Sequence, residues 1–240
     1  RVGENGEVSG TTVNETGETL QPAEFSRIVA ITERAVINGD AVGIVEQALQ
    51  AGRMAARTVE AWAWYTLLSN PNLADGNSLF STSRGNDAAS GGVPSKATLQ
   101  TAFAAIATHE TPSGDPMDTT PGALLFPPSI AGDALQTLES FAAPGADLPA
   151  PVQSGWLENG VTVETDTGPL TAAGDANQWF LVGDPEQTDG VTVGFVDGVD
   201  APDIQRGEES SALAKLYRVT LRFGVGVSGY RGLYRNDGGA

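Results

Sequence analysis

Cysteine is missing from the sequence, and so is any stretch long and apolar enough to cross a membrane. None of the 240 residues is Cys, which excludes disulfides, thiolate catalysis and Cys-ligated zinc. No run of about 18 or more apolar residues occurs, so no membrane span is expected. The opening residues, RVGENGEVSG, lack the charged-then-apolar order of a signal peptide. Because the first residue is Arg1 rather than Met, we expect either that an N-terminal segment was removed or that the sequence starts inside a longer protein.

Basic residues are scarce. The chain has 13 Lys and Arg against 30 Asp and Glu, a net charge of −17, and a pI near 4.2. Such a surface repels phosphates, so general nucleic-acid binding is disfavoured, and solubility is the simplest interpretation of the acidity. Between residues 140 and 210 the only base is Arg206, whereas the five bases after residue 210 oppose a single acid, Asp237. This asymmetry suits subunits that meet unlike surfaces of their neighbours.

Candidate catalytic and metal-binding residues are few. The single histidine, His109, would be needed for a Ser/His/Asp triad, and no Ser lies in a nucleophile-elbow sequence. We therefore predict a structural or surface role for His109 and no enzymatic activity. Two acidic groups, Asp115 with Asp118 and the cluster at 184–189, lack the spacing of an EF-hand. Solvated loops are favoured over cation sites there, so no metal and no cofactor is predicted.

The first 30 residues have the composition of an extended arm. Glycines alternate with Glu, Thr and Val, and no helical period is present. An isolated hairpin of this kind would be marginal in water. We predict that residues 1–30 gain order only by lying on another copy of the chain.

A long helix is predicted from Ala41 to Leu68. Apolar residues recur there at a spacing of three to four, Asp40 is a candidate N-cap, and Asn70-Pro71 ends the pattern. At the usual rise per residue, about 28 residues would form a rod of roughly 40 Å.

Two shorter helices are predicted in the middle of the chain. Ser95 is expected to cap one that extends to about His109, and Ser129 to cap another. The expected inward residues are Leu99, Phe103 and Ile106 in the first, and Leu135, Leu138 and Phe141 in the second.

The clearest strand signal comes late, from Tyr217 to Val227, where apolar residues alternate with polar or basic ones. The basic face could touch DNA, although pairing with a neighbour's acids is the favoured interpretation. Gly224, Gly226 and Gly229 are followed by no helix, so a dinucleotide-binding loop is excluded. Glycines in a long strand usually mark bends or a close approach of another backbone.

A series of short motifs, taken in order, resembles one known family. The motifs are ETL and FSRI between Glu18 and Ile28, ITERAVINGD ending at Asp40, NP with DG and LF between residues 70 and 80, SRGN containing Asn86, WFLVGDP from Trp179, and RFGVGVSGYRGLYRNDGGA from Arg222. The chain resembles the major capsid proteins of tailed bacteriophages with the HK97-like fold, specifically the Mu-like major head subunits, some of which are fused to a prohead protease. Arg84 stands where that family usually has His, which affects a local loop rather than the fold.

The resemblance implies an α+β architecture. Residues 1–30 would form the E-loop, an extended arm over a neighbouring subunit. Residues 31–111 and 205–240 would form the peripheral domain, with the spine helix at about 40–69 and a long strand at about 212–235. Residues 112–204 would form the axial domain, which gathers around five- and six-fold centres. Cross-linking in one branch of this fold needs a Lys on the arm, and residues 1–30 have none, so a non-covalent shell is expected.

The function implied is that of a major head protein that assembles into an icosahedral shell around the phage genome. The partners would be other copies in hexamers and pentamers, with portal and cement proteins and non-specifically held DNA as further candidates. The location would be the virion, after assembly in the host cytoplasm. The alternative is a decoration, tail or other extracellular β-rich binding protein. The candidate inter-subunit contacts are Glu7, Val13, Glu15, Glu18, Arg27, Arg34, Arg53, Arg57, Arg218, Arg222, Arg231 and Arg235.

Overall fold

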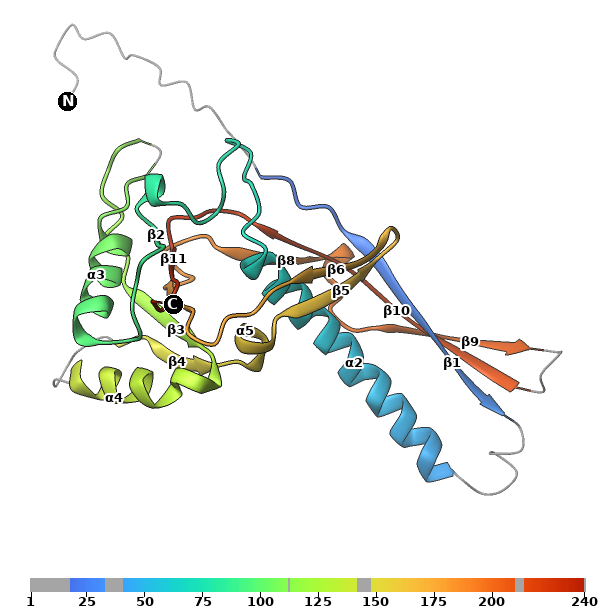
Figure 1. The fold of residues 1–240 in the computed structure, drawn as a ribbon. Helices are drawn as coiled ribbons and strands as arrows, with labels where there is room; N and C mark the ends of the chain where they lie inside the picture. Colours follow the sequence, from blue (N-terminus) through green and yellow to red (C-terminus); the bar gives the residue numbers. More distant parts are fainter. Residues whose placement is uncertain (1–17, 33–40, 112, 142–147, 210–213, 240) are drawn as a thin grey trace, which may run out of the picture.

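The computed structural model describes residues 18–32, 41–111, 113–141, 148–209 and 214–239. The fold mixes helices and sheets, as predicted, with a lobe at one end and an elongated part at the other (Figure 1). Within these ranges, no helix combines the length and the apolar character that a membrane span requires.

Strand β10 (Ala214–Val227) organises the elongated part. It pairs antiparallel with β1 (Ala23–Thr32) along one edge, and with β9 (Asp203–Glu209) and then β8 (Val191–Phe195) along the other. We call β1, β9 and the part of β10 that pairs with them the tongue. The predicted strand is therefore present, but it ends at Val227 and does not run to residue 235. A turn closed by the Leu233 N–H bond to the Tyr230 carbonyl (3.0 Å) separates it from β11 (Leu233–Asn236).

The first strand corrects the predicted arm. Residues 23–30 were expected to depend on another copy, but β1 pairs with β10 of the same chain over its whole length, from Ala23 opposite Phe223 to Thr32 opposite Ala214. The prediction is wrong for this segment because an antiparallel partner far along the sequence supplies its backbone hydrogen bonds. Residues 1–17 lie outside the described part of the chain.

Helix α2 (Ala41–Leu68) is confirmed with the predicted bounds, while its candidate cap Asp40 lies outside the described residues. The helix packs between two sheets. On the tongue side, Phe25 lies 5.6 Å from Trp62 and 4.5 Å from Phe223, measured between ring centroids. On the other side lies the hairpin of β5 (Val161–Thr165) and β6 (Gly168–Ala172), whose buried residues contact Ala61, Trp62, Trp64, Tyr65 and Leu68. A lone hairpin is marginal in water, so this contact stabilises both partners.

The lobe is built on a five-stranded sheet with the order β2 (Asp87–Ala88), β11, β7 (Trp179–Gly183), β3 (Pro121–Phe126) and β4 (Ala150–Gln153). The central strand β7 is buried on both faces, since Trp179, Phe180 and Leu181 are at most 1% exposed. Trp179 and Leu181 pack against α3 (Lys96–Ala107) and α4 (Ala131–Phe141), whereas Phe180 packs with the short α5 (Gly155–Asn159) and the end of α2. The two faces of one strand thus join two hydrophobic cores.

The two helices of the lobe match the predictions to different degrees. The Ser95 side chain accepts a hydrogen bond from the Thr98 N–H and the Thr98 hydroxyl accepts one from the Ser95 N–H, so the predicted cap is a complete capping box. The predicted Ser129 cap is wrong, because a 3-10 turn at Pro128–Ile130 precedes α4 and the Ser129 hydroxyl donates to the Ala176 carbonyl. Leu135, expected inside, is 44% exposed.

The lobe also contains segments that the sequence assigned elsewhere. Helix α3 and strand β11 belong to the stretches expected in the peripheral domain, yet α3 packs in the same core as α4, and β11 pairs with β7. In the described residues, the segments on either side of residue 111 therefore pack in one core. The residues after 205 are likewise shared between the tongue and the lobe.

Candidate interaction surfaces

The tongue has two unlike faces. Alternate residues of a strand point to opposite sides, and the β10 residues that face α2 include the apolar Val219, Leu221 and Phe223, which are at most 8% exposed. The opposite face, which we call the outer face, carries Glu24, Ser26 and Ile28 of β1 beside Arg222, Thr220 and Arg218 of β10. On this outer face Ile28 is 56% exposed.

The arginines of the outer face differ in their partners. The Arg222 guanidinium donates to the Glu24 carboxylate at 2.8 Å, and this hydrogen bond and charge lower the pKa of Glu24 and raise the pKa of Arg222. Both side chains are about half exposed, so water and salt screen the pair and it adds little to folding stability. Arg218, opposite Ile28, is exposed and has no ion pair with a described residue.

A shallow pocket of about 160 Å³ lies on the same face. Its walls include Val196, Val199 and Ala201, with Thr220 and Arg222 from β10 and two acids, Asp197 and Asp203. Val199 is 54% exposed. The outer face therefore combines apolar and charged groups that are open to solvent in one copy.

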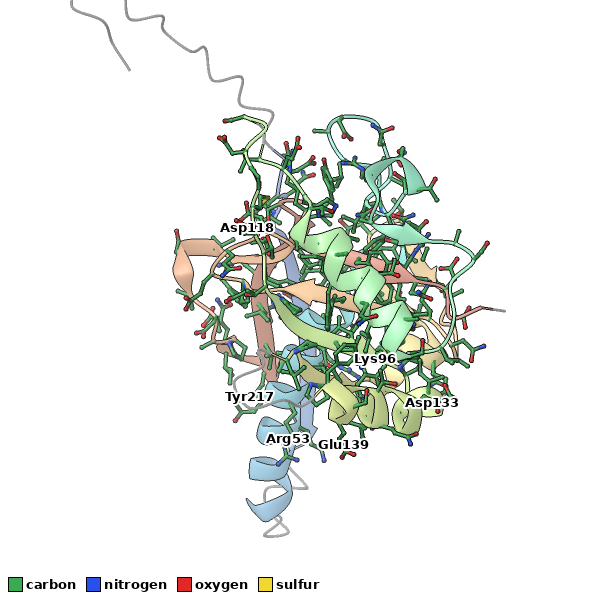
Figure 2. All side chains as sticks on the ribbon, turned by 90° about the vertical axis from the view of Figure 1, so that its left-hand side faces the viewer. Arg53, Lys96, Asp118, Asp133, Glu139 and Tyr217 are labelled. Atoms are coloured by element: carbon green, nitrogen blue, oxygen red, sulfur yellow. The ribbon has the colours of Figure 1, made fainter. Side chains whose placement is uncertain are left out.

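Helix α2 presents a second basic surface. Arg53 and Arg57 are exposed one helical turn apart, and the Arg57 guanidinium lies 5.9 Å from the Trp156 ring. Glu60 accepts hydrogen bonds from the Trp64 and Trp156 indoles at 3.4 and 3.2 Å. Arg53 and Arg57 form no ion pair with any residue that the structure describes. Arg53 stands out from the helix in Figure 2.

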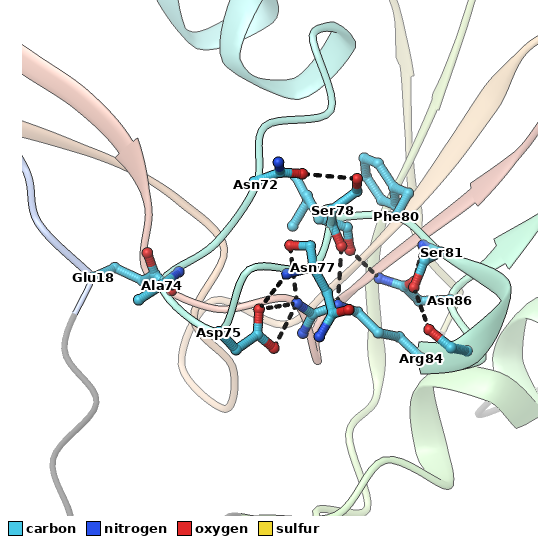
Figure 3. A network of polar contacts seen from close by, with 12 residues as sticks. Glu18, Asn72, Ala74, Asp75, Asn77, Ser78, Phe80, Ser81, Arg84 and Asn86 are labelled. Atoms are coloured by element: carbon cyan, nitrogen blue, oxygen red, sulfur yellow. Dashed lines mark hydrogen bonds and ion pairs between the residues drawn. The ribbon is translucent and has the colours of Figure 1, made fainter.

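The loop between α2 and β2 is held by a polar network (Figure 3). The Arg84 side chain, 6% exposed, donates to both Asp75 oxygens at 2.7 Å and to the carbonyls of Ser78 and Asn77. The Asn77 N–H bond to Asp75, aided by Arg84, lowers the pKa of Asp75. The loop in turn binds the N-terminal segment, since the Ala74 N–H donates to the Glu18 carboxylate at 2.8 Å.

Tyr230 and His109 join this loop to the end of the chain. The Tyr230 ring lies 4.1 Å from the Arg84 guanidinium and 4.9 Å from that of Arg231, measured to the ring centroid. The His109 ring nitrogens lie against the Arg231 and Arg84 carbonyls, and Arg231 Nε donates to the Glu110 carbonyl at 2.6 Å. His109 is thus a structural residue, as predicted. No local pattern predicts the stacking of Arg84 on Tyr230, because these residues are far apart in the chain.

No group of His, Asp and Glu that could hold a metal ion occurs among the described residues. In the acidic cluster at 184–189, Asp184 instead accepts a hydrogen bond from the Glu186 N–H at 2.9 Å, which is a local turn contact. The outer face of the tongue and the basic surface of α2 remain as candidate surfaces. Both combine charged side chains with apolar or aromatic ones, as surfaces for protein contacts do.

Comparison with known proteins decides which kind of protein presents these surfaces. Residues 16–236, almost the whole chain, match the family described as phage capsid protein. The chain belongs to the phage capsid protein family. None of the curated proteins is similar enough in sequence to match this capsid protein.

Solved structures resemble this capsid protein throughout. The Mycobacterium phage Patience structure has 11% identity and a TM-score of 0.53, covering 97% of this chain and 76% of that one. The head of Helicobacter pylori bacteriophage KHP40 has 11% identity and a TM-score of 0.54, covering 96% and 81%. The capsid of a native GTA particle has 12% identity and a TM-score of 0.55, covering 100% and 82%. These similarities confirm the predicted HK97-like fold, and the family membership shows the role, that of a shell-forming capsid protein.

The predicted contact residues of the capsid protein fall into three groups. Glu7, Val13, Glu15 and Arg34 lie outside the described residues. Glu18, Arg222, Arg231 and Arg235 are used within the chain; Arg235 donates to Asp87 at 2.8 and 2.9 Å and its side chain is 19% exposed. Arg27, Arg53, Arg57 and Arg218 are exposed, and Arg27 contacts the Met54 sulfur at 3.7 Å.

The sequence alone does not distinguish these groups. Arg218 and Arg235 look alike in the sequence, but only Arg235 has a carboxylate, Asp87, brought beside it by the parallel pairing of β2 with β11.

Proposed function

We propose that copies of this capsid protein form hexamers and pentamers that tile an icosahedral shell around a phage genome, and that the chain catalyses no reaction. Its family membership carries this proposal. The exposure of large apolar side chains supports it, since Ile28, Val199 and Ile204, all on or beside the tongue, are 56%, 54% and 55% exposed. Apolar side chains are thus open on both faces of the tongue, since Ile28 lies opposite Arg218 and Ile204 lies opposite Val219, and a neighbouring copy would cover them.

Each part of the fold then has a role in the shell. Helix α2 with the tongue would form the peripheral domain, with α2 as its spine helix. The lobe, including α3 and β11, would form the axial domain around the five- and six-fold centres. Residues 1–17 would form the arm that lies on a neighbouring copy. These boundaries replace the division at residues 30, 111 and 205.

The contacts between copies would be electrostatic in part. From Ala97 to Gln205 there is no Lys or Arg, while 16 of the 30 acids lie in this stretch. Arg53, Arg57 and Arg218 would face such acidic surfaces of neighbours, because opposite charges favour correct encounters and fix the register between subunits. The resemblance further suggests the Mu-like type, assembly in the host cytoplasm, and contacts with portal and cement proteins.

Electron microscopy of the purified chain tests the proposal. We expect closed particles or five- and six-membered rings, and monomers under all assembly conditions would refute it. A variant that lacks residues 1–17 should remain a folded subunit, because β1 and its partner β10 are retained, but should form no stable shells. The control replaces residues 1–17 by a Gly/Ser segment of equal length, which should fail equally. Shells from either variant would contradict the arm role.

Charge reversal tests the basic surface of α2. We expect Arg53→Glu to reduce particle yield roughly tenfold, which is the effect of about 1.4 kcal/mol on an assembly equilibrium. Lys96→Glu is the control, since Lys96 is an exposed base on α3, away from α2. Equal yields from Arg53→Glu and wild type would remove Arg53 from the interface.

A further inference from the structure

Three glycines form a trough on the outer face of the sheet, beyond the end of the tongue. Gly224 and Gly226 belong to β10, and Gly194 of β8 lies directly opposite Gly224. Leu20, Gln21 and Pro22 of the same chain lie over them. We call Gly194, Gly224 and Gly226 the glycine trough, and residues 18–22 the strap.

The strap lies so close that side chains in the trough would displace it. A Cβ atom at Gly226 would stand 2.9 Å from Leu20 Cδ1, and one at Gly224 would stand 2.8 Å from the Gln21 carbonyl oxygen and 3.0 Å from Pro22 Cα. A Cβ at Gly194 would also collide with the Leu20 side chain. Glycine within a strand weakens it, so glycines at such positions usually mark a close approach of another backbone.

The strap is also fixed at both ends. At its C-terminal end it continues into β1, which begins its pairing at Ala23. At its N-terminal end the Glu18 carboxylate accepts the 2.8 Å hydrogen bond from Ala74. That N–H belongs to the loop held by Arg84 (Figure 3). The strap therefore crosses from the tongue to this loop along a single defined path.

We propose that the glycine trough is a binding site for the strap of its own chain, and that this contact sets the point and direction from which residues 1–17 start toward a neighbouring copy. The inference rests on the proposed shell-forming function. A tethered segment binds its target as if at high local concentration only when its starting point is within reach of the target. An anchored strap supplies a fixed starting point and leaves less freedom to be lost on binding.

A filled trough tests the inference. In Gly226→Val, the new side chain occupies the place of Leu20. We expect hydrogen exchange of the strap amides in the unassembled subunit to rise at least tenfold, and particle yield to fall by a similar factor. The matched control is Gly207→Val in β9, where a Cβ would meet only Leu216 Cβ, at 3.8 Å. The control should leave both measurements unchanged. Leu20→Ala, which leaves the trough empty and the sheet intact, should have the same effects as Gly226→Val in weaker form.

Because the chain has no Cys, a disulfide can hold the strap in place. Leu20→Cys with Gly226→Cys brings two thiols close to each other, because a Cβ at Gly226 would stand 2.9 Å from the Leu20 side chain. We expect an intrachain disulfide and normal assembly of the oxidised protein. Assembly that occurs only after reduction would show that the strap must detach, and an interchain disulfide would show that the trough takes a neighbour's strap; either result would overturn the proposal.

If hydrogen exchange shows that Gly226→Val loosens the strap, but the variant forms as many particles as wild type, the strap has no role in assembly. That result would also overturn the proposal. Unchanged exchange in Gly226→Val would show that the trough does not hold the strap. If the wild type forms no particles, the shell-forming function fails, whereas the exchange measurement still reports on the strap by itself.

Discussion

Asn86 is predicted to be the most sensitive polar residue of the loop between α2 and β2. It is fully buried, donates to the Leu79 carbonyl at 2.8 Å and accepts from the Ser81 N–H at 3.0 Å. Asn86→Ala leaves that carbonyl and that N–H without a partner inside the protein. Each unsatisfied buried group costs about 1–3 kcal/mol, so we expect a total loss of about 2–6 kcal/mol. For a chain of this size, that corresponds to a decrease in Tm of roughly 4–24 °C.

Urea unfolding of the unassembled subunit, followed by tryptophan fluorescence, measures the loss. Asn72→Ala is the matched control in the same loop, because Asn72 is exposed and accepts only the Ser78 hydroxyl, at 3.0 Å; it should cost less than about 0.5 kcal/mol. Asn86→Asp should not rescue stability, since it removes the donor and buries a charge. An Asn86→Ala variant within about 0.5 kcal/mol of wild type would falsify the reasoning, because the two buried bonds would then contribute nothing.

Three further results are expected. Leu181→Ala, at a fully buried position of β7, should reduce the free energy of unfolding by about 2–5 kcal/mol, whereas Leu135→Ala, at a position 44% exposed, should cost less than about 1 kcal/mol in the same urea titration. The lowered pKa of Asp75 means that its ionised form stabilises the fold. This stabilisation is complete at neutral pH and is lost as the pH falls from the usual Asp pKa of about 3.9 through the lowered folded value; hydrogen exchange in the loop should rise over this range in wild type but not in Asp75→Asn. Particle yield, measured by light scattering, should increase between about 0.1 and 1 M NaCl. The Debye length falls there from about 10 to 3 Å, so salt screens the repulsion between the acidic lobes. Scattering that decreases with salt would show instead that the attraction of the arginines outweighs this repulsion.

The parts of the fold that the sequence predicted well are those with a local, periodic cause. Helix α2 has an apolar spacing and an Asn70-Pro71 stop, and both are local signals. The Ser95 cap likewise depends on a residue three positions away. Leu135 was misplaced because a periodic pattern gives the apolar side of a helix but not how far the neighbouring elements extend over it.

Long-range pairing caused the main errors. Nothing within residues 23–32 indicates that their partner begins about 180 residues later, at Ala214, so the segment was assigned to a neighbouring copy. The same limit applies to the candidate contacts. Arg235 and Arg222 meet their acids, Asp87 and Glu24, only after β-strands that are far apart in the chain have paired. By contrast, the late glycines were predicted to mark bends or a close approach of another backbone, and the second of these is confirmed at Gly224, where the strap backbone lies close.

The continuity of β10 with β11 has a mechanical consequence. The first of these strands lies in the tongue and its sheet, and the second lies inside the sheet of the lobe, with only the short turn at 228–232 between them. A force that pulls the tongue away from the lobe is therefore transmitted along the backbone itself. It reaches the backbone hydrogen bonds that hold β10 to β1 and β8, and those that hold β11 to β7, so both sheets carry the load. A shell subunit built in this way would resist stretching, because one continuous stretch of backbone connects the sheet of the tongue to the sheet of the lobe.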